Sequence, residues 1–358
     1  MSNLDEALER FHLADLEYAG GYANHGPMGA EALESIGHQA LIPAFLDLYA
    51  PRLPPAEPGA ALDPSELATA RGESTRRADW VATFEARLTQ SDWRALVREV
   101  LPGLIGGLFA GAGHGLLRCA HAVRSLERKD DPLRRRELAR ALAAWEARYQ
   151  SLPGVPGSRA SPSGSDGDLV GFFASLPLLG EASSREGLFF ETARRLDDFA
   201  PFAEAIAVAP VPRTRAALGA WLSTLVRVSA TLYLAHPEAR IAYVHAVTLP
   251  AAWRLLAPLL DDETALRGAA GVLQSVAALH SLFGEEPGEA PEPDAEVAAT
   301  AESWDEIRYR AACSLEEHAI KMVEACWRED RLSPDRVLRL AAADAALRLE
   351  PRKGTWGC

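Results

Sequence analysis

The chain has 358 residues, of which 48% are hydrophobic and 24% charged, and its formal net charge is −13. This apolar content excludes a mostly disordered chain, and four cysteines without a CxxC pair exclude a disulfide scaffold and a zinc ribbon. An acidic surface repels phosphate backbones, so we expect no nucleic-acid partner. The cysteine usage is typical of a reducing compartment, and we expect a cytoplasmic protein.

Neither a signal peptide nor a membrane span is predicted. The N-terminus carries Asp5, Glu6 and Glu9 before any apolar run, unlike a signal peptide. The uncharged stretch Leu101–Leu117 is shorter than the ~20 residues that a bilayer span needs, and it contains a proline and several glycines. We therefore expect no membrane partner.

Helical periodicity runs through nearly the whole chain, and alternating strand patterns are almost absent. The ambiguous segment Ile241–Val247 follows Pro237, which favours a helix. Ser91 is the expected N-cap of the first clear helix, and Ser333 caps the last one, with Pro334 at its first position. The sequence thus predicts an all-α fold, with helices at Asp92–Val100, Glu137–Tyr149, Thr214–Leu234, Glu263–Phe283, Ser303–Arg328 and Pro334–Leu349.

Two stretches are predicted to be long mobile loops. Residues 151–168 are rich in Gly, Pro and Ser, and residues 284–294 are acidic and rich in proline. The first is compatible with a linker between two domains. The candidate site residues lie on both sides of it, however, so we expect one large helical domain over residues 1–358.

The common nucleotide and hydrolase motifs are missing. The glycine-rich run Gly103–Gly115 has no preceding strand and no acidic residue at the distance that a dinucleotide-binding fold requires. The P-loop and GxSxG patterns do not occur. These glycines are instead predicted to permit close backbone packing near His114.

The nine histidines are the strongest chemical signal. His12 and His236 lie at polar helix ends and are predicted to be on the surface. The others have apolar neighbours, and buried imidazoles need partners. A shared metal ion is one such partner for several of them, while hydrogen bonds within the core are the simpler alternative. Because HExxH and ExxH pairs are absent, any metal must be gathered from separate helices. The candidates are His25, His38, His114, His121, His245, His280 and His318.

Spacing sorts these candidates further. His114 and His121 are seven residues apart, roughly 10 Å along a helix, so only one of them is expected to ligate directly. His318 and Lys321 share a helical face. A wheel centred on the neighbouring apolar residues places Lys321 towards solvent, and Glu316, Glu317 and Glu324 are likewise expected to face solvent.

Lysine usage argues against a solvent-facing Lys321. Only three of the 37 basic residues are lysines, so a solvated site in this chain would carry arginine. A desolvated lysine amine can lose its proton and react with carbon dioxide to form a carbamate, which is an oxygen ligand for metals.

Four short motifs carry a family resemblance: Asn24-His25-Gly26-Pro27-Met28, His114-Gly115-Leu116-Leu117-Arg118, His245-Ala246-Val247-Thr248 and Glu317-His318-Ala319-Ile320-Lys321. In them the chain resembles the questin oxidase-like family, from about Tyr22 to about Cys326. The resemblance implies a mononuclear non-haem iron held by His25, His114, His245, His318 and a carboxylated Lys321. It also implies a reduced nicotinamide as external reductant, for which no binding motif is visible.

The resulting hypothesis is a metal-dependent oxygenase. It would use dioxygen to oxidise or cleave a ring of a hydrophobic polycyclic aromatic, anthraquinone-like metabolite. Tyr22, His121, Tyr243 and Thr248 are expected to line the pocket or to hydrogen-bond to the ligands. Gly26 stands where the family has a larger apolar residue, and we expect it to widen the pocket. The alternatives are a metal-dependent hydrolase with a carbamylated lysine and a non-catalytic helical protein that binds a metabolite.

Overall fold

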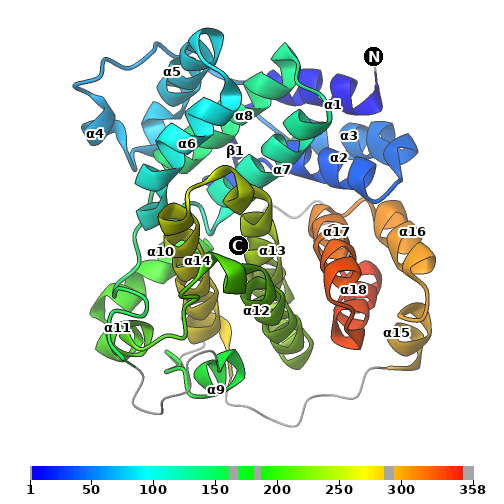
Figure 1. The fold of residues 1–358 in the computed structure, drawn as a ribbon. Coiled ribbons are helices and arrows are strands. Elements are labelled where there is room, and N and C mark those ends of the chain that lie inside the picture. The colour runs from blue at the N-terminus through cyan, green and yellow to red at the C-terminus, as the bar shows by residue number, and fades with distance from the viewer. Residues whose placement is uncertain (1, 161–167, 181–186, 286–293, 350–358) are drawn as a thin grey trace.

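The computed structural model describes residues 2–160, 168–180, 187–285 and 294–349, and its regular structure is almost entirely helical (Figure 1). The all-α prediction is confirmed. The N-terminal half contains α1 (Asn3–His12), α2 (Gly26–Ser35), α3 (Ile42–Tyr49), α4 (Leu67–Ala70), α5 (Arg77–Gln90), α6 (Trp93–Leu104), α7 (His114–Arg128) and α8 (Pro132–Ala147).

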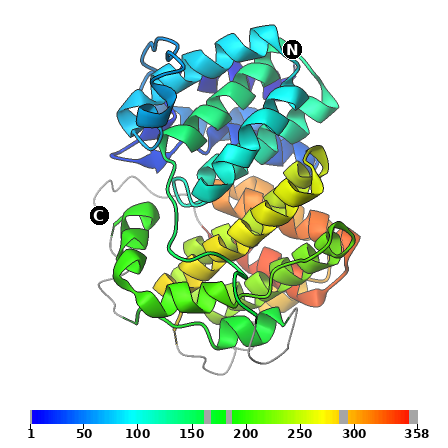
Figure 2. The same ribbon diagram turned by 60° about the vertical axis from the view of Figure 1, so that its left-hand side comes forward.

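The C-terminal half follows the predicted loop at 151–168 and stacks against the first half as a second layer (Figure 2). Of the two predicted loops, residues 161–167 and 286–293 lie outside the described residues. This half contains α9 (Leu169–Ala174), α10 (Phe189–Thr192), α11 (Ala200–Ala207), α12 (Arg215–Ala235), α13 (Arg240–Leu256), α14 (Asp262–Phe283), α15 (Ala295–Thr300), α16 (Trp304–Ser314), α17 (Glu317–Leu332) and α18 (Arg336–Arg348).

The two halves are joined by side-chain packing rather than by the loop alone. Helix α7 packs on α13, and α2 packs on α17. One apolar core contains side chains of both halves, among them Leu116 of α7 and Leu249 of α13. A smaller core combines α1, α2 and α3 with Ala312 and Ile320 from the end of the chain. The two halves therefore share closely packed apolar cores, and such packing limits the movement of the side chains that project from their helices.

The helix predicted over Ser303–Arg328 is broken. Helix α16 ends at Ser314, Leu315 has a positive φ of 52°, and Glu316 caps the new helix α17. A left-handed residue interrupts the helical hydrogen bonds, so the chain changes direction there.

The capping predictions at Ser91 and Ser333 are wrong as well, because Asp92 and Asp335 accept backbone N–H groups in the first turns of α6 and α18. The helical choice for Ile241–Val247 is confirmed by α13.

A two-stranded hairpin of β1 (Glu17–Tyr18) and β2 (Tyr22–Ala23) precedes α2. Its turn uses Gly20 and Gly21, whose φ values of +83° and +136° suit glycine. Strands of two residues are too short to leave a periodic pattern in the sequence. The hairpin places Tyr18 and Tyr22 beside the start of α2.

Helix α12 is long and apolar enough to cross a membrane by length and composition alone. However, 56% of its most apolar window is buried, and it packs on α13, α14 and α18. More than half of this apolar window is thus covered by neighbouring parts of the fold.

Candidate metal centre

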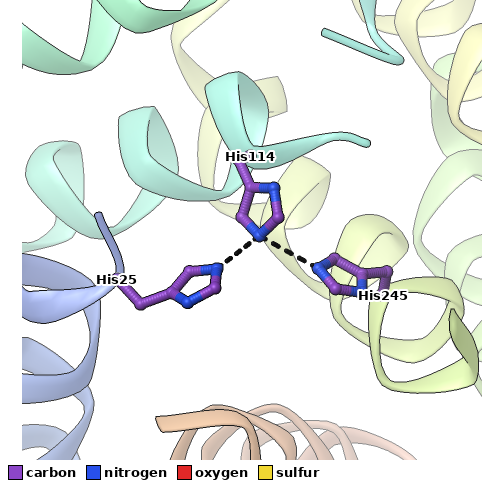
Figure 3. Close-up of side chains that lie close together, drawn as sticks. All are labelled: His25, His114 and His245. Carbon is purple, nitrogen blue, oxygen red and sulfur yellow. Dashed lines mark hydrogen bonds between the residues drawn. The ribbon is translucent and has the colours of Figure 1, made fainter. Parts of the chain in front are cut away.

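Three histidines from three different helices converge at the interface between the halves (Figure 3). Nε2 of His114 lies 2.5 Å from Nε2 of His25 and 3.0 Å from Nε2 of His245. His25 and His245 are buried, at 4% and 2% exposure, and His114 is partly exposed. His25 and His114 come from the N-terminal half and His245 from the C-terminal half.

Local structure sets His25 and His114 at helix starts. His25 immediately precedes α2, and its backbone N–H donates to the Tyr49 hydroxyl at 2.8 Å. His114 is the first residue of α7 and follows Gly113, which has φ +86°. A Cβ on Gly113 would lie 2.4 Å from the Leu249 side chain. The prediction that these glycines permit close packing near His114 is therefore confirmed.

Backbone carbonyls determine which ring nitrogen carries the proton. Nδ1 of His114 contacts the carbonyl oxygen of Gly111, and Nδ1 of His245 lies 2.8 Å from the carbonyl oxygen of Ile241. A carbonyl can only accept, so each Nδ1 must donate its hydrogen. In the neutral imidazoles Nε2 is then a bare lone pair, and the two lone pairs face each other.

This arrangement fits a metal cation. Protonation would relieve the repulsion between Nε2 atoms, but burial lowers the pKa of His114 and of His245 well below the usual value. The neighbouring imidazoles and the Lys321 ammonium lower both pKa values further. Two ligands on bonds of about 2.1 Å at right angles are about 3 Å apart, close to the separations seen here. A bound cation would thus use all the converging lone pairs.

The fourth histidine stands beside this group and is oriented by a carboxylate. The ring of His318 is 4.8 Å from the ring of His25 and 5.7 Å from that of His245, between centroids. Its Nδ1 lies 2.8 Å from Oε1 of Glu316. A carboxylate on the far nitrogen is the usual partner of a metal-ligating histidine. Glu317 lies 3.6 Å from Nδ1 of His25, and its other oxygen is 4.0 Å from Arg52.

Lys321 is buried, at 2% exposure. The expectation that a wheel places it towards solvent is wrong, because α17 packs on α2 and α13 and so is covered on several sides. Burial lowers the pKa of Lys321 to about 8, against the opposing effect of Glu317 and Glu316. By contrast, the other lysine in the described part of the chain, Lys129, is exposed and paired with Asp131.

Glu316, Glu317 and Glu324 were expected to face solvent, and all three are buried. Counterions explain how the Glu324 carboxylate is tolerated there. Burial raises the pKa of Glu324, but Arg124 and Arg328 both bind it, outweigh burial and lower the pKa to about 2. Burial and the neighbouring Glu317 instead raise the pKa of Glu316 to about 8.

A cavity of about 120 Å³ opens onto the histidines. Its walls are mainly aromatic, with Tyr18 and Tyr22 stacked at 5.8 Å and Phe189 edge-on to His245 at 5.7 Å. Its polar side chains are the four imidazoles, the two tyrosines, Glu317 and Arg52, which is the cationic one among the lining residues. Flat aromatic molecules match such walls in shape and polarity. The lining consists of Tyr18, Gly21, Tyr22, Ala23, His25, Arg52, Gly111, Ala112, His114, Gly187, Leu188, Phe189, Phe190, Ile241, His245, Glu317 and His318.

Gly26 does not widen this cavity. A Cβ at Gly26 would lie 2.4 Å from Cε1 of Phe11, and Gly26 is absent from the cavity wall. The glycine instead allows the Phe11 ring of α1 to pack against the start of α2.

Of the four residues expected around the pocket, Tyr22 lines the cavity and the other three do not. Nδ1 of His121 lies 2.6 Å from Glu31. The Tyr243 hydroxyl lies 2.6 Å from Nδ1 of His280, and Thr248 donates to the carbonyl of Val244 within α13. The structure therefore separates these side chains from the cavity, although they share helices with the proposed ligands.

A buried ion network lies behind the site and was not visible in the sequence. Glu31 of α2 contacts His121, Arg124 and Arg128 of α7, and Arg124 also binds Glu324 of α17. The network therefore joins three of the helices that carry proposed ligands. An isolated Glu inside an apolar helix was the signal that could have indicated it.

His12 is also not a surface residue. It is 5% exposed, and its Nε2 lies 3.1 Å from Glu137, which also binds Arg118. Arg134, in the first turn of α8, is likewise buried, and its Nη1 donates to Asp5 of α1. Both side chains are buried because α1 packs on α8.

No protein-family profile matches the chain, and no curated protein matches it. The resemblance to the questin oxidase-like family therefore stays a prediction, carried by the four motifs.

Proposed function

We propose that the chain is a metal-dependent oxygenase of the questin oxidase type, acting on a flat polycyclic aromatic substrate. The observation that carries the proposal is the convergence of the Nε2 atoms of His25, His114 and His245, with carbonyls holding the Nδ1 protons of the last two. His318 and a carboxylated Lys321 would complete the ligand set that the motifs imply. Bound iron(II) would supply the redox chemistry that activates dioxygen.

Lys321 would contribute an oxygen ligand, because its amine is buried. A buried amine with no room for bulk hydration is the kind that reacts with carbon dioxide, forming an N–C bond and releasing one proton. The product carries a negative charge beside neutral imidazoles. An anionic oxygen donor favours iron over a site of nitrogen donors alone.

The cavity residues would bind and orient the substrate. Tyr18, Tyr22 and Phe189 offer ring faces and edges to a flat molecule, and the buried surroundings exclude water from it. Arg52 can donate hydrogen bonds to a phenolate or quinone oxygen. Glu316 and Glu317 would hold their histidines in the orientation that ligation needs.

The deciding experiment combines metal analysis with oxygen uptake. Protein purified without a His-tag and loaded anaerobically with iron(II) should retain about one equivalent of iron. It should then consume dioxygen when a hydroxyanthraquinone and a nicotinamide reductant are added. Zinc in place of iron, together with hydrolysis of test esters and no oxygen uptake, would favour the hydrolase alternative. Less than about 0.2 equivalents of any transition metal would favour a non-catalytic binding protein.

A further inference from the structure

A second cavity, of about 180 Å³, lies in the N-terminal half and shares no lining residue with the aromatic cavity. It is bounded by α5, α8 and the segment that follows α1. Its apolar wall includes Leu16, Pro58 and Val81, and its polar wall includes Arg77 and Arg140. The volume is roughly ten times what one water molecule requires.

Apart from the exposed Glu57, the charged side chains around this cavity are paired, with one buried exception. Arg77 forms a double hydrogen bond with Asp15, at 2.7 and 2.5 Å. Arg136 pairs with Glu85 at 2.8 Å. Because Asp15 and Glu85 are already paired with these arginines, neither carboxylate acts as the counterion of another cation in the cavity.

Arg140 is the exception. It is 4% exposed, and no carboxylate oxygen in the described part of the chain lies within 4.0 Å of its guanidinium. Its Nη2 donates to the carbonyl of Ala14, while its Nε has no hydrogen-bond partner. The nearby Glu137 is already bound by Arg118 and His12.

A buried guanidinium without a counterion is costly. Burial and the neighbouring charge of Arg118 together lower the pKa of Arg140 to about 10. An arginine stays protonated at neutral pH even so. The geometry therefore leaves one cation facing a cavity that is large enough for a small anion.

The lining selects among anions. The planar guanidinium fork matches a carboxylate. Glu57 and Glu85 also line the cavity, and their negative charges disfavour a dianion such as phosphate. The apolar wall of Pro58 and Val81 can cover a short hydrocarbon chain. We propose that this cavity binds a small organic monocarboxylate, with its carboxylate on Arg140 and its hydrocarbon part against Val81.

Calorimetric titration of the full chain with butyrate tests this proposal. Saturable binding is expected, and Arg140→Met should weaken it at least tenfold, because the charge is lost while the apolar stem remains. Arg135→Met is the matched control on the same helix, since Arg135 is exposed and pairs with Asp130. It should bind butyrate as the parent chain does. Butan-1-ol, which has the same hydrocarbon chain without the charge, should not bind.

A second variant makes the test independent of how well Arg140→Met folds. Val81→Phe puts a larger side chain into the lining of the same cavity and should also abolish butyrate binding. The proposal is overturned if butyrate does not saturate, if either variant binds it unchanged, or if inorganic phosphate binds more tightly than butyrate. Metal content plays no part in these readouts, so they stand apart from the proposed oxygenase function.

Discussion

Glu316 holds His318 through one carboxylate oxygen and the backbone of α17 through the other. Oε1 lies 2.8 Å from Nδ1 of His318, and Oε2 accepts the backbone N–H of Ala319 at 2.6 Å. The same side chain thus begins the helix and sets the direction of the imidazole on its first turn. Glu316 can make both contacts because the helix is interrupted at Leu315, which leaves Glu316 at the N-cap of α17.

Glu316→Gln should weaken metal binding about 10- to 100-fold, the usual cost of losing a partner behind a ligating histidine. A glutamine has a single carbonyl oxygen, so it cannot accept both hydrogen bonds with full strength. A competition titration with a chromogenic chelator measures the affinity. Glu306→Gln, at an exposed position of α16, is the control. Equal affinities in the two variants would contradict the orienting role.

His114→Ala and His245→Ala should each abolish stoichiometric metal binding while preserving helicity. Each variant removes an Nε2 lone pair from the convergent group, and the packing around it is otherwise unchanged. Elemental analysis gives the metal content, and far-ultraviolet circular dichroism gives the helicity. His38→Ala is the control, because His38 is half-buried beside Tyr309 and outside the group. Full metal content in His114→Ala would show that the ligands are assigned wrongly.

Lys321→Arg should be as inactive as Lys321→Ala, because a guanidinium keeps the positive charge but cannot form a carbamate. Labelling with ¹³C-bicarbonate should give a carbamate carbon signal in the parent chain and none in either variant. Lys129→Arg, at an exposed lysine, should change the free energy of unfolding by no more than about 0.5 kcal/mol. A fully active Lys321→Arg enzyme would remove the carbamate from the proposal.

Acid should destabilise the fold between about pH 4.5 and pH 2 through Glu137. Burial alone would raise its pKa, but Arg118 and His12 outweigh burial and lower the pKa to about 2. A carboxyl group with a depressed pKa stabilises the fold above its unfolded value, and this contribution is lost as the pH falls through the folded value. Burial of His12 lowers its pKa too, so its protonation opposes folding in the same direction.

Urea unfolding across this pH range checks the effect, which is on the order of 3 kcal/mol for a shift of this size. Glu137→Gln should be less stable at pH 7 and should show a flatter dependence on pH. A parent chain whose stability is constant from pH 5 to pH 3 would refute the assignment. His12→Ala should cost about 1–3 kcal/mol, because it leaves part of a buried carboxylate without its partner.

The fold class could be predicted because it depends on local patterns, and the motifs singled out His25, His114 and His245, which lie close together in the structure. Long amphipathic helices such as α12 and α14 leave a clear period in the sequence, and the glycines before His114 indicate a close approach. Lys321 stood out through the composition of the chain as a whole. The burial of Lys321 supports the interpretation that this position carries a lysine for a reason other than its positive charge.

The remaining features depend on contacts between distant segments. Glu31 meets Arg124 only after α2 and α7 are packed side by side, and no spacing rule relates residues 93 positions apart. The burial of His12 depends in the same way on how α1 lies on α8. The break at Leu315 was missed because its left-handed backbone is set by the packing around it rather than by a glycine or proline.

Because the site lies at the interface between the halves, a metal bound there would contribute to the free energy that holds the halves together. Two proposed histidine ligands come from each half, so neither half presents the full set until the two are docked. An ion that binds only the docked form adds RT ln(1 + [M]/Kd) to the free energy of unfolding, about 2.7 kcal/mol at a free concentration one hundred times Kd. The melting temperature of the chain would then rise with the free metal concentration. A chelator would weaken the docking of the two halves before either half unfolds.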